Sequence, residues 1–182
     1  MKGTIQLVAL DPVASSAWLA GVMDVDLRCF GAPHAWREPE FMADRPEKWR
    51  LSCAATKDDR IVGVAMGYLW ARKVAHLSRL GVLPSARGNR VGEMLVRHFQ
   101  ENASAIGCEA MTLEFEDSLG VADFYTRCGF RELSPEGVGT YLKLKGKYSQ
   151  VSRYGPHGRR VFAYSAAAAF DVARINKEDL LT

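Results

Sequence analysis

Between a predicted strand at residues 77–82 and a predicted amphipathic helix lies the stretch Arg87-Gly88-Asn89-Arg90-Val91-Gly92. The start of a helix carries unpaired backbone amides and the positive end of the helix dipole, and both attract anions. Gly88 and Gly92 let the backbone approach a phosphate closely, while Arg87 and Arg90 add positive charge. The stretch therefore predicts a cradle for an anion such as a pyrophosphate.

The spacing of this stretch is neither that of a dinucleotide fingerprint nor that of a P-loop, which ends in Gly-Lys-Ser or Gly-Lys-Thr. A surface turn with two arginines is the alternative, because glycine also marks ordinary turns. Neighbouring segments carry further motifs. They are Leu80-Gly81-Val82-Leu83-Pro84, Leu113-Glu114-Phe115 and Phe124-Tyr125-Thr126-Arg127-Cys128-Gly129-Phe130.

Together these segments resemble the GCN5-related N-acetyltransferase (GNAT) superfamily over residues 50–145. In that family the pattern Gln/Arg-x-x-Gly-x-Gly/Ala opens the helix that binds the pyrophosphate of acyl-CoA. Arg87 and Gly92 match its ends, and Arg90 replaces its middle glycine. The resemblance implies an α/β fold with a mixed central sheet of about six to seven strands flanked by about four helices. It also implies acetyl-CoA as co-substrate, held by Leu80, Gly81, Val82, Arg87, Gly88, Asn89, Arg90, Val91 and Gly92.

The resemblance implies chemical roles for side chains further along the chain. Tyr125 matches the residue that protonates the departing CoA thiolate, and it adds to the cofactor contacts. Glu114 matches the carboxylate that takes a proton from the attacking amine, and Ser118 stands where many relatives have an asparagine that binds the cofactor. A core aromatic and an outward-facing strand glutamate are the alternatives for Tyr125 and Glu114. Direct transfer is favoured over an acyl-cysteine at Cys128, which has no histidine near it in sequence.

The acceptor is expected to be a primary amine. The segment with Trp36 and Phe41 is loosely similar to the substrate loop of the branch that acetylates protein N-termini, including those of ribosomal proteins. We expect Trp36 and Phe41 to line an acceptor pocket, although aromatic residues in a loop also serve simply to pack it. A small-molecule amine, such as an amino sugar or polyamine, is the other acceptor class.

The composition bounds the domain count and the compartment. A chain of 182 residues with 48% hydrophobic residues fits one domain with an appendage, here 1–145 and a C-terminal extension at 146–182. The formal net charge of +3 is too small to predict nucleic-acid binding, yet residues 71–98 hold six Lys or Arg and one acid, which suits a polyanionic cofactor. The cysteine and histidine spacings predict no metal site. We expect a cytoplasmic protein with reduced thiols and no membrane span.

Hydrophobic periodicity and turn residues predict the order of the elements. The predicted strands are 4–10, 50–56, 60–70, 77–82, 110–115 and 140–144. The predicted helices are 11–29, 38–44, one that follows the glycine loop and ends at Gly107, and 118–127 with Ser118 as its cap.

The C-terminal extension supports a second hypothesis. Residues 143–160 hold six Lys or Arg and no acid, and three tyrosines lie in or beside this range, at 141, 148 and 154. This composition suits binding to nucleic acid, a nucleotide or an acidic protein surface. A solvated extension explains it equally well. Residues 161–175 predict an ordered segment that docks on the domain or on a second subunit. The alternative function is a non-catalytic acyl-CoA-binding module that uses this basic tail for its partners.

Overall fold

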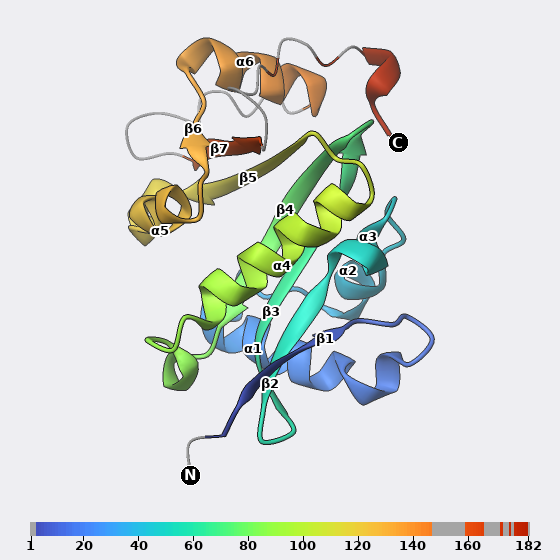
Figure 1. Cartoon of the computed structure of the whole chain (residues 1–182), viewed down its shortest axis with the longest axis vertical. Helices are drawn as coiled ribbons and strands as arrows, with labels where there is room; N and C mark the ends of the chain where they lie inside the picture. The colour runs from blue at the N-terminus through green and yellow to red at the C-terminus, as the bar shows by residue number, and fades with distance from the viewer. Residues whose placement is uncertain (1–2, 147–158, 166–171, 173–174, 176, 182) are drawn as a thin grey trace. The chain divides into compact units, whose positions relative to one another are not determined.

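The computed structural model describes residues 3–146, 159–165, 172, 175 and 177–181 (Figure 1). Seven strands form a mixed sheet in the order β1-β2-β3-β4-β5-β7-β6, so the predicted α/β class is confirmed. The strands are β1 (Ile5–Ala9), β2 (Cys53–Lys57), β3 (Arg60–Ala71), β4 (Val74–Val82), β5 (Ala110–Glu116), β6 (Arg131–Glu132) and β7 (Arg159–Ser165). The helices are α1 (Leu19–Phe30), α2 (Glu38–Met42), α3 (Lys48–Leu51), α4 (Val91–Ala105), α5 (Ala122–Arg127) and α6 (Pro135–Leu144).

The chain divides into two compact units, and the first spans Met1–Tyr68 and Leu77–Ala105. Its strands β1, β2 and β3 pair in antiparallel order. The β2–β3 hairpin turns through Asp58 and Asp59, whose φ angles of 50° and 60° are those of the turn that matches strand twist. The predicted hairpin is confirmed, but its first strand begins at Cys53 because residues 48–51 form α3.

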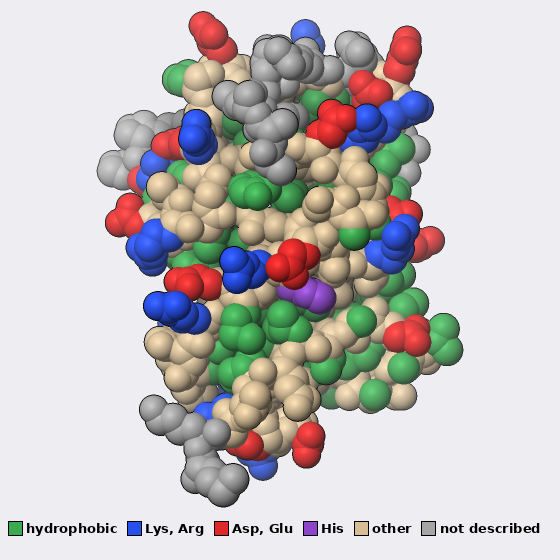
Figure 2. All heavy atoms as spheres, viewed as in Figure 1, with side chains coloured by type: hydrophobic (Ala, Val, Ile, Leu, Met, Phe, Trp, Pro, Cys, Tyr) green, Lys and Arg blue, Asp and Glu red, His purple; other side chains and the backbone are tan. Residues whose placement is uncertain are grey.

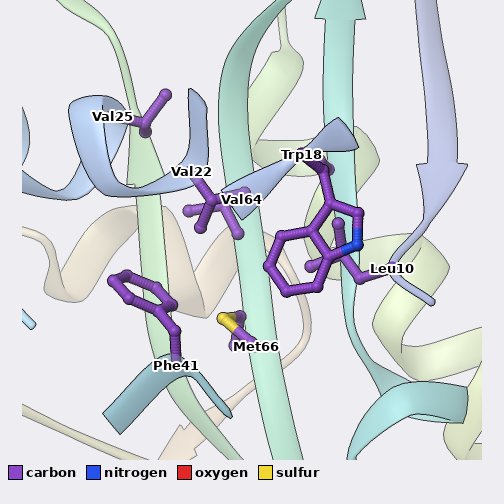
Figure 3. Close-up of a cluster of buried hydrophobic side chains, with 8 residues drawn as sticks. Leu10, Trp18, Val22, Val25, Phe41, Val64 and Met66 are labelled. Carbon is purple, nitrogen blue, oxygen red and sulfur yellow. The ribbon is translucent and has the colours of Figure 1, made fainter. Parts of the chain in front are cut away.

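The core of this unit lies under α1 (Figure 3). Val22 and Val25 are fully buried in a hydrophobic cluster with Trp18, so one face of α1 packs into the core. Helix α1 starts at Leu19 rather than near Asp11, because the Asp11 carboxylate accepts a hydrogen bond from the backbone N–H two residues on and holds a turn there. The cluster also includes Leu10, Phe41, Ala54, Val64 and Met66.

The second unit spans Leu69–His76 and Ile106–Thr182. Strand β7 pairs in antiparallel fashion with β5 on one side and β6 on the other, so a strand from the predicted extension belongs to the sheet. Arg160 on β7 donates hydrogen bonds to both carboxylate oxygens of Glu132 and to Asp117. These contacts raise the pKa of the Arg160 guanidinium above its ordinary value. The first part of the predicted docking segment, residues 161–165, therefore belongs to strand β7. Residues 166–171 of that segment and residues 147–158 of the basic stretch at 143–160 lie outside the described residues.

In the second unit one predicted strand was wrong and one predicted helix begins later than expected. Residues 140–144 form the end of α6 rather than a strand. Ser134 caps that helix by accepting a hydrogen bond from the Gly137 backbone N–H at 3.2 Å, and Pro135 occupies its first turn. The predicted helix 118–127 is shorter, because α5 begins only at Ala122 and Ser118 lies in a preceding 3₁₀ turn instead of capping it.

The visible surface carries both signs of charge. Figure 2 shows Lys and Arg side chains interspersed with Asp and Glu side chains. Exposed ion pairs, such as that of Lys73 with Glu109 at 2.5 Å, add little stability. No helix in the described part of the chain is long and apolar enough to cross a membrane.

Candidate functional site

The predicted anion cradle lies in the first unit, where the chain enters α4. Gly88 has a φ of 78° and Arg90 a φ of 58°, so both adopt the left-handed conformation. Space around Gly88 is open, since a Cβ built there would meet no atom within 4 Å. The chain then enters a 15-residue helix at Val91, whose first amides have no partner within the helix. An open glycine, a left-handed turn and a helix start together fit a bound phosphate.

The two arginines of the cradle are held differently. The Arg87 side chain donates a hydrogen bond from Nε to the backbone carbonyl of Val82 at 3.1 Å, and this contact ties the loop to the end of β4. The Asn89 side chain donates to the carbonyls of Ala86 and Arg87, each at 3.3 Å, and closes the turn. Arg90 is exposed and makes no ion pair or side-chain hydrogen bond with any residue that the structure describes. Its guanidinium is therefore available to a ligand.

The end of β4 packs closely on α1. A Cβ on Gly81 would lie 3.3 Å from the Cys29 sulfur, so glycine permits this close approach. Burial raises the pKa of the Cys29 thiol although the neighbouring Arg87 opposes the shift, so the thiol favours its protonated form. Leu80, Gly81 and Val82 lie on this segment, immediately before the cradle.

The two aromatic residues predicted for the acceptor pocket differ in exposure. Trp36 is half-buried and meets Phe41 edge to face, with ring centroids 5.4 Å apart. Phe41 is fully buried in the hydrophobic cluster, so it has no surface to offer a substrate. The prediction that Phe41 lines the pocket is corrected, because a helical position on α2 turns its ring into the core. Trp36 remains a candidate.

The second unit holds the predicted acid and base. Glu114 lies on β5, with 9% of its side chain exposed, and its carboxylate lies 3.8 Å from the guanidinium of Arg159 on β7. The carboxylate of Glu114 therefore faces a cation on the neighbouring strand. Tyr125 is buried on α5 and its ring stacks on Phe115 with centroids 5.4 Å apart. Because neighbouring strand residues face opposite ways, Glu114 and the Phe115–Tyr125 stack lie on opposite faces of β5.

The protonation of Tyr125 follows from its surroundings. Burial raises the pKa of its hydroxyl, with a smaller contribution from Cys128, so the side chain stays protonated at neutral pH. The described residues supply no hydrogen-bond partner for this hydroxyl. Ser118 is exposed in the turn between β5 and α5. The second unit therefore joins a protonated phenol, a carboxylate and an exposed serine around the end of β5.

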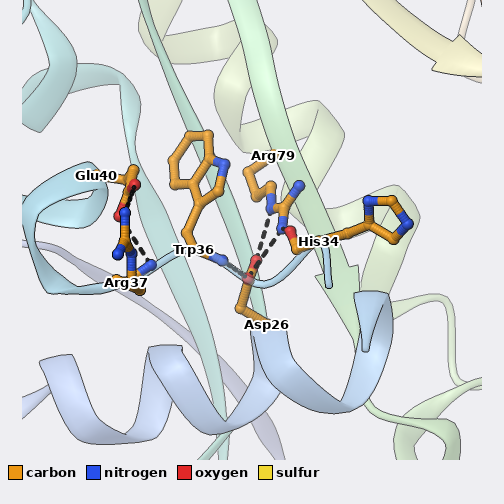
Figure 4. A network of polar contacts seen from close by, with 6 residues as sticks. All are labelled: Asp26, His34, Trp36, Arg37, Glu40 and Arg79. Carbon is orange, nitrogen blue, oxygen red and sulfur yellow. Dashed lines mark hydrogen bonds and ion pairs between the residues drawn. The ribbon is translucent and has the colours of Figure 1, made fainter. Parts of the chain in front are cut away.

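Sequence reasoning missed a buried ion pair beside Trp36. Asp26 on α1 is completely buried and Arg79 on β4 pairs with it (Figure 4). No local signal in the sequence joins two residues that are 53 positions apart. Nor do the described residues contain a group of three or more side chains suited to a metal ion.

Comparisons with known proteins agree with this arrangement. The family model described as the acetyltransferase (GNAT) family matches residues 19–130. No curated protein matches the sequence significantly.

Solved structures share the fold at low sequence identity. The ribosomal-protein-S18-alanine N-acetyltransferase of Escherichia coli superposes with a TM-score of 0.66 and 16% identity, over 92% of this chain and 97% of that one. Arabidopsis thaliana Naa50, in complex with the bisubstrate analogue CoA-Ac-MVNAL, gives 0.63 and 17% over 88% and 98%. Ard1 from Thermoplasma volcanium gives 0.65 and 16% over 90% and 98%. Identities this low establish the shared fold alone.

Proposed function

Because the chain belongs to the acetyltransferase (GNAT) family, we propose that it transfers an acetyl group from acetyl-CoA directly to a primary amine. The observation that carries the proposal is the cradle, in which Gly88 and Arg90 turn the backbone left-handed at the start of α4. In this proposal the amides of residues 88–92 and the side chains of Arg87 and Arg90 bind the pyrophosphate. Residues 80–82 and Ser118 contact the rest of the cofactor.

Acetyl transfer requires two proton movements, and the second unit offers one group for each. The amine attacks the thioester carbonyl as the neutral base, and Glu114 takes the proton that the nitrogen releases. The C–S bond breaks as the C–N bond forms, and the CoA sulfur leaves as a thiolate. Tyr125 protonates that thiolate, a step that its protonated state supports. We assign Glu114 to the amine side of the thioester and Tyr125 to its sulfur side.

Two acceptor classes remain within the proposal. A protein N-terminus is supported by the fold shared with the S18-alanine acetyltransferase and with Naa50, whose bisubstrate analogue carries a peptide. The half-buried Trp36 offers a flat apolar surface to either a peptide or a small amine. We expect the reaction to take place in the cytoplasm. Binding of nucleic acid through the basic tail belongs only to the alternative function, and docking on a second subunit remains a prediction.

The test combines binding with turnover. Calorimetry with acetyl-CoA should show binding that weakens in Arg87→Ala and Arg90→Ala, with desulfo-CoA and ATP as reference ligands. Transfer of radiolabelled acetyl groups should then be measured to an alanine-initiated hexapeptide and to spermidine. Binding with turnover supports the enzyme. Binding without transfer to any amine, together with salt-sensitive binding to RNA, would favour the non-catalytic module instead.

A further inference from the structure

Asp26 and Arg79 form a two-pronged ion pair inside the first unit (Figure 4). The Arg79 Nε donates to Asp26 Oδ1 at 2.6 Å, and Nη2 donates to Oδ2 at 2.9 Å. The Asp26 side chain is 0% exposed and the Arg79 side chain 13% exposed. A carboxylate is costly to bury unless a cation and further hydrogen bonds compensate it, so this pair needs additional partners.

Those partners come from the backbone of the segment between α1 and α2, residues 31–37, here called the α1–α2 loop. The Trp36 backbone N–H donates to Asp26 Oδ2 at 2.6 Å. On the other side, Arg79 Nη2 also donates to the His34 backbone carbonyl. Asp26 and Arg79 therefore each bind one backbone group of the same loop, one belonging to Trp36 and the other to the residue two positions before it.

Aromatic rings complete the enclosure of Arg79. Its guanidinium carbon lies 3.7 Å from the centroid of the Phe30 ring and 5.0 Å from that of the Trp36 ring. A planar guanidinium gains from cation–π contact at such distances, whereas an ammonium group fits this flat space less well. The position of the Trp36 ring is thus set by its own amide and by the cation beneath it.

The ion pair of Asp26 and Arg79 lies next to the strand segment assigned to the cofactor, residues 80–82. Arg79 directly precedes Leu80 on β4, and Gly81 allows Cys29 of α1 to pack on the same strand. The α1–α2 loop therefore starts above the strand end that, in the proposed function, contacts acetyl-CoA. An amine must come close to the thioester to react, so this loop is well placed to hold it.

We infer that Asp26 and Arg79 are positioning residues for the acceptor amine, which hold the α1–α2 loop and Trp36 in the binding arrangement before the amine arrives. The inference rests on the proposed function. It makes the acceptor site preformed rather than assembled by the substrate, so the acceptor does not have to order this loop when it binds.

Two variants separate this role from a general loss of structure. Asp26→Asn keeps the shape and one acceptor oxygen for Trp36 but removes the charge that Arg79 requires. Arg79→Lys keeps the charge but loses the fork and the flat surface. Asp24→Asn is the matched control, since Asp24 lies on the same helix in an exposed pair with Arg28 at 2.8 Å.

Three readouts are measured on each folded variant: backbone exchange of the Trp36 amide by NMR, acetyl-CoA affinity by calorimetry, and steady-state kinetics with whichever of the alanine-initiated hexapeptide and spermidine the wild type acetylates. In Asp26→Asn we expect faster exchange at Trp36, acetyl-CoA affinity within twofold of wild type, and an acceptor KM raised about tenfold with a smaller change in kcat. The values for Arg79→Lys should lie between those of the wild type and those of Asp26→Asn, and Asp24→Asn should match the wild type.

The outcomes distinguish the two levels of the argument. If the wild type acetylates an acceptor but both variants retain its KM and slow Trp36 exchange, the positioning role is wrong while the proposed function stands. The positioning role would also be wrong if acetyl-CoA affinity fell by the same factor as the acceptor KM rose, because the ion pair would then support the fold in general. If the wild type binds no acetyl-CoA, or binds it but acetylates no amine, the proposed function fails and the inference fails with it.

Discussion

Gly63 on β3 lies directly against Leu95 on α4, so closely that a Cβ on Gly63 would be 2.9 Å from the Leu95 Cδ1 atom. The same Cβ would lie 3.2 Å from the Gly81 carbonyl oxygen and 3.2 Å from Val91 Cγ1. The absence of a side chain at Gly63 therefore lets the first turns of α4, and with them the cradle, lie flat on the sheet.

Gly63→Ala should destabilise the protein by about 1–3 kcal/mol, because the added methyl group overpacks a filled interface. Chemical denaturation measures the change. Gly139 gives the matched control, since a Cβ there meets nothing within 4 Å on helix α6. Gly139→Ala should stabilise by up to about 1 kcal/mol through helix propensity. Equal effects of the two substitutions would show that the contact with Leu95 carries no weight.

Arg90→Gly should stabilise the free protein by about 1 kcal/mol and weaken acetyl-CoA binding. The left-handed φ of 58° is unfavourable for a residue with a side chain, and glycine removes that cost. The lost guanidinium removes a charge from the phosphate site. Thermal unfolding and calorimetry measure the two effects. Tighter binding by the glycine variant would contradict the role assigned to the arginine side chain.

Tyr125→Phe should lower kcat by about 10²–10⁴-fold while acetyl-CoA affinity stays within about threefold, because the ring stack on Phe115 remains and only the proton donor is lost. Burial raises the pKa of Tyr125, so its ionisation should cause no loss of wild-type activity below about pH 10. Single-turnover assays across pH 7–10 test both statements. An unchanged kcat in Tyr125→Phe would leave Tyr125 a core residue.

The contribution of Lys48 to the free energy of unfolding should rise as pH increases. Its ammonium is buried and donates to the backbone carbonyls of Phe41 and Ala43 at 2.5 and 2.8 Å, and burial lowers the pKa of Lys48 to about 8. The unfolded chain, with a lysine pKa near ~10.4, binds more protons between these values, so this residue's contribution to stability should rise from pH 8 to pH 10.

Thermal unfolding of wild type and Lys48→Met at pH 7 and pH 9.5 isolates that contribution. The stability of the wild type relative to the variant should increase with pH. A difference that stays constant, or that falls, would mean that the carbonyl contacts hold the proton on Lys48 against the effect of burial.

The sequence predicts elements well where a local signal and the packing agree. Helix α4 follows its glycine loop as expected, and β5 and the β2–β3 hairpin lie within a few residues of their predicted positions. The strand predicted at 140–144 was wrong even though Ser134 and Pro135 provide a helix start, because the buried Tyr141 and Leu142 resemble a strand when considered alone.

The candidate site was predictable only where it is carried by a motif. The cradle at 87–92 forms a continuous stretch, so the resemblance covers it completely. The pair of Asp26 and Arg79 arises from the packing of α1 on β4, and neither residue has a local pattern that marks it. Phe41 was misassigned for the same reason, since its exposure depends on the tertiary packing of a short helix.

The order of strands β5, β7 and β6 affects how this protein is made. During synthesis β6 leaves the ribosome about 27 residues before β7, the strand with which it pairs. Strand β5 also pairs with β7 and leaves the ribosome earlier still. Until residues 159–165 emerge, strands β5 and β6 lack the strand that lies between them, and with it apolar side chains such as Val161 and Phe162. A nascent chain stalled before Arg159 therefore exposes an open strand edge to other chains and to chaperones.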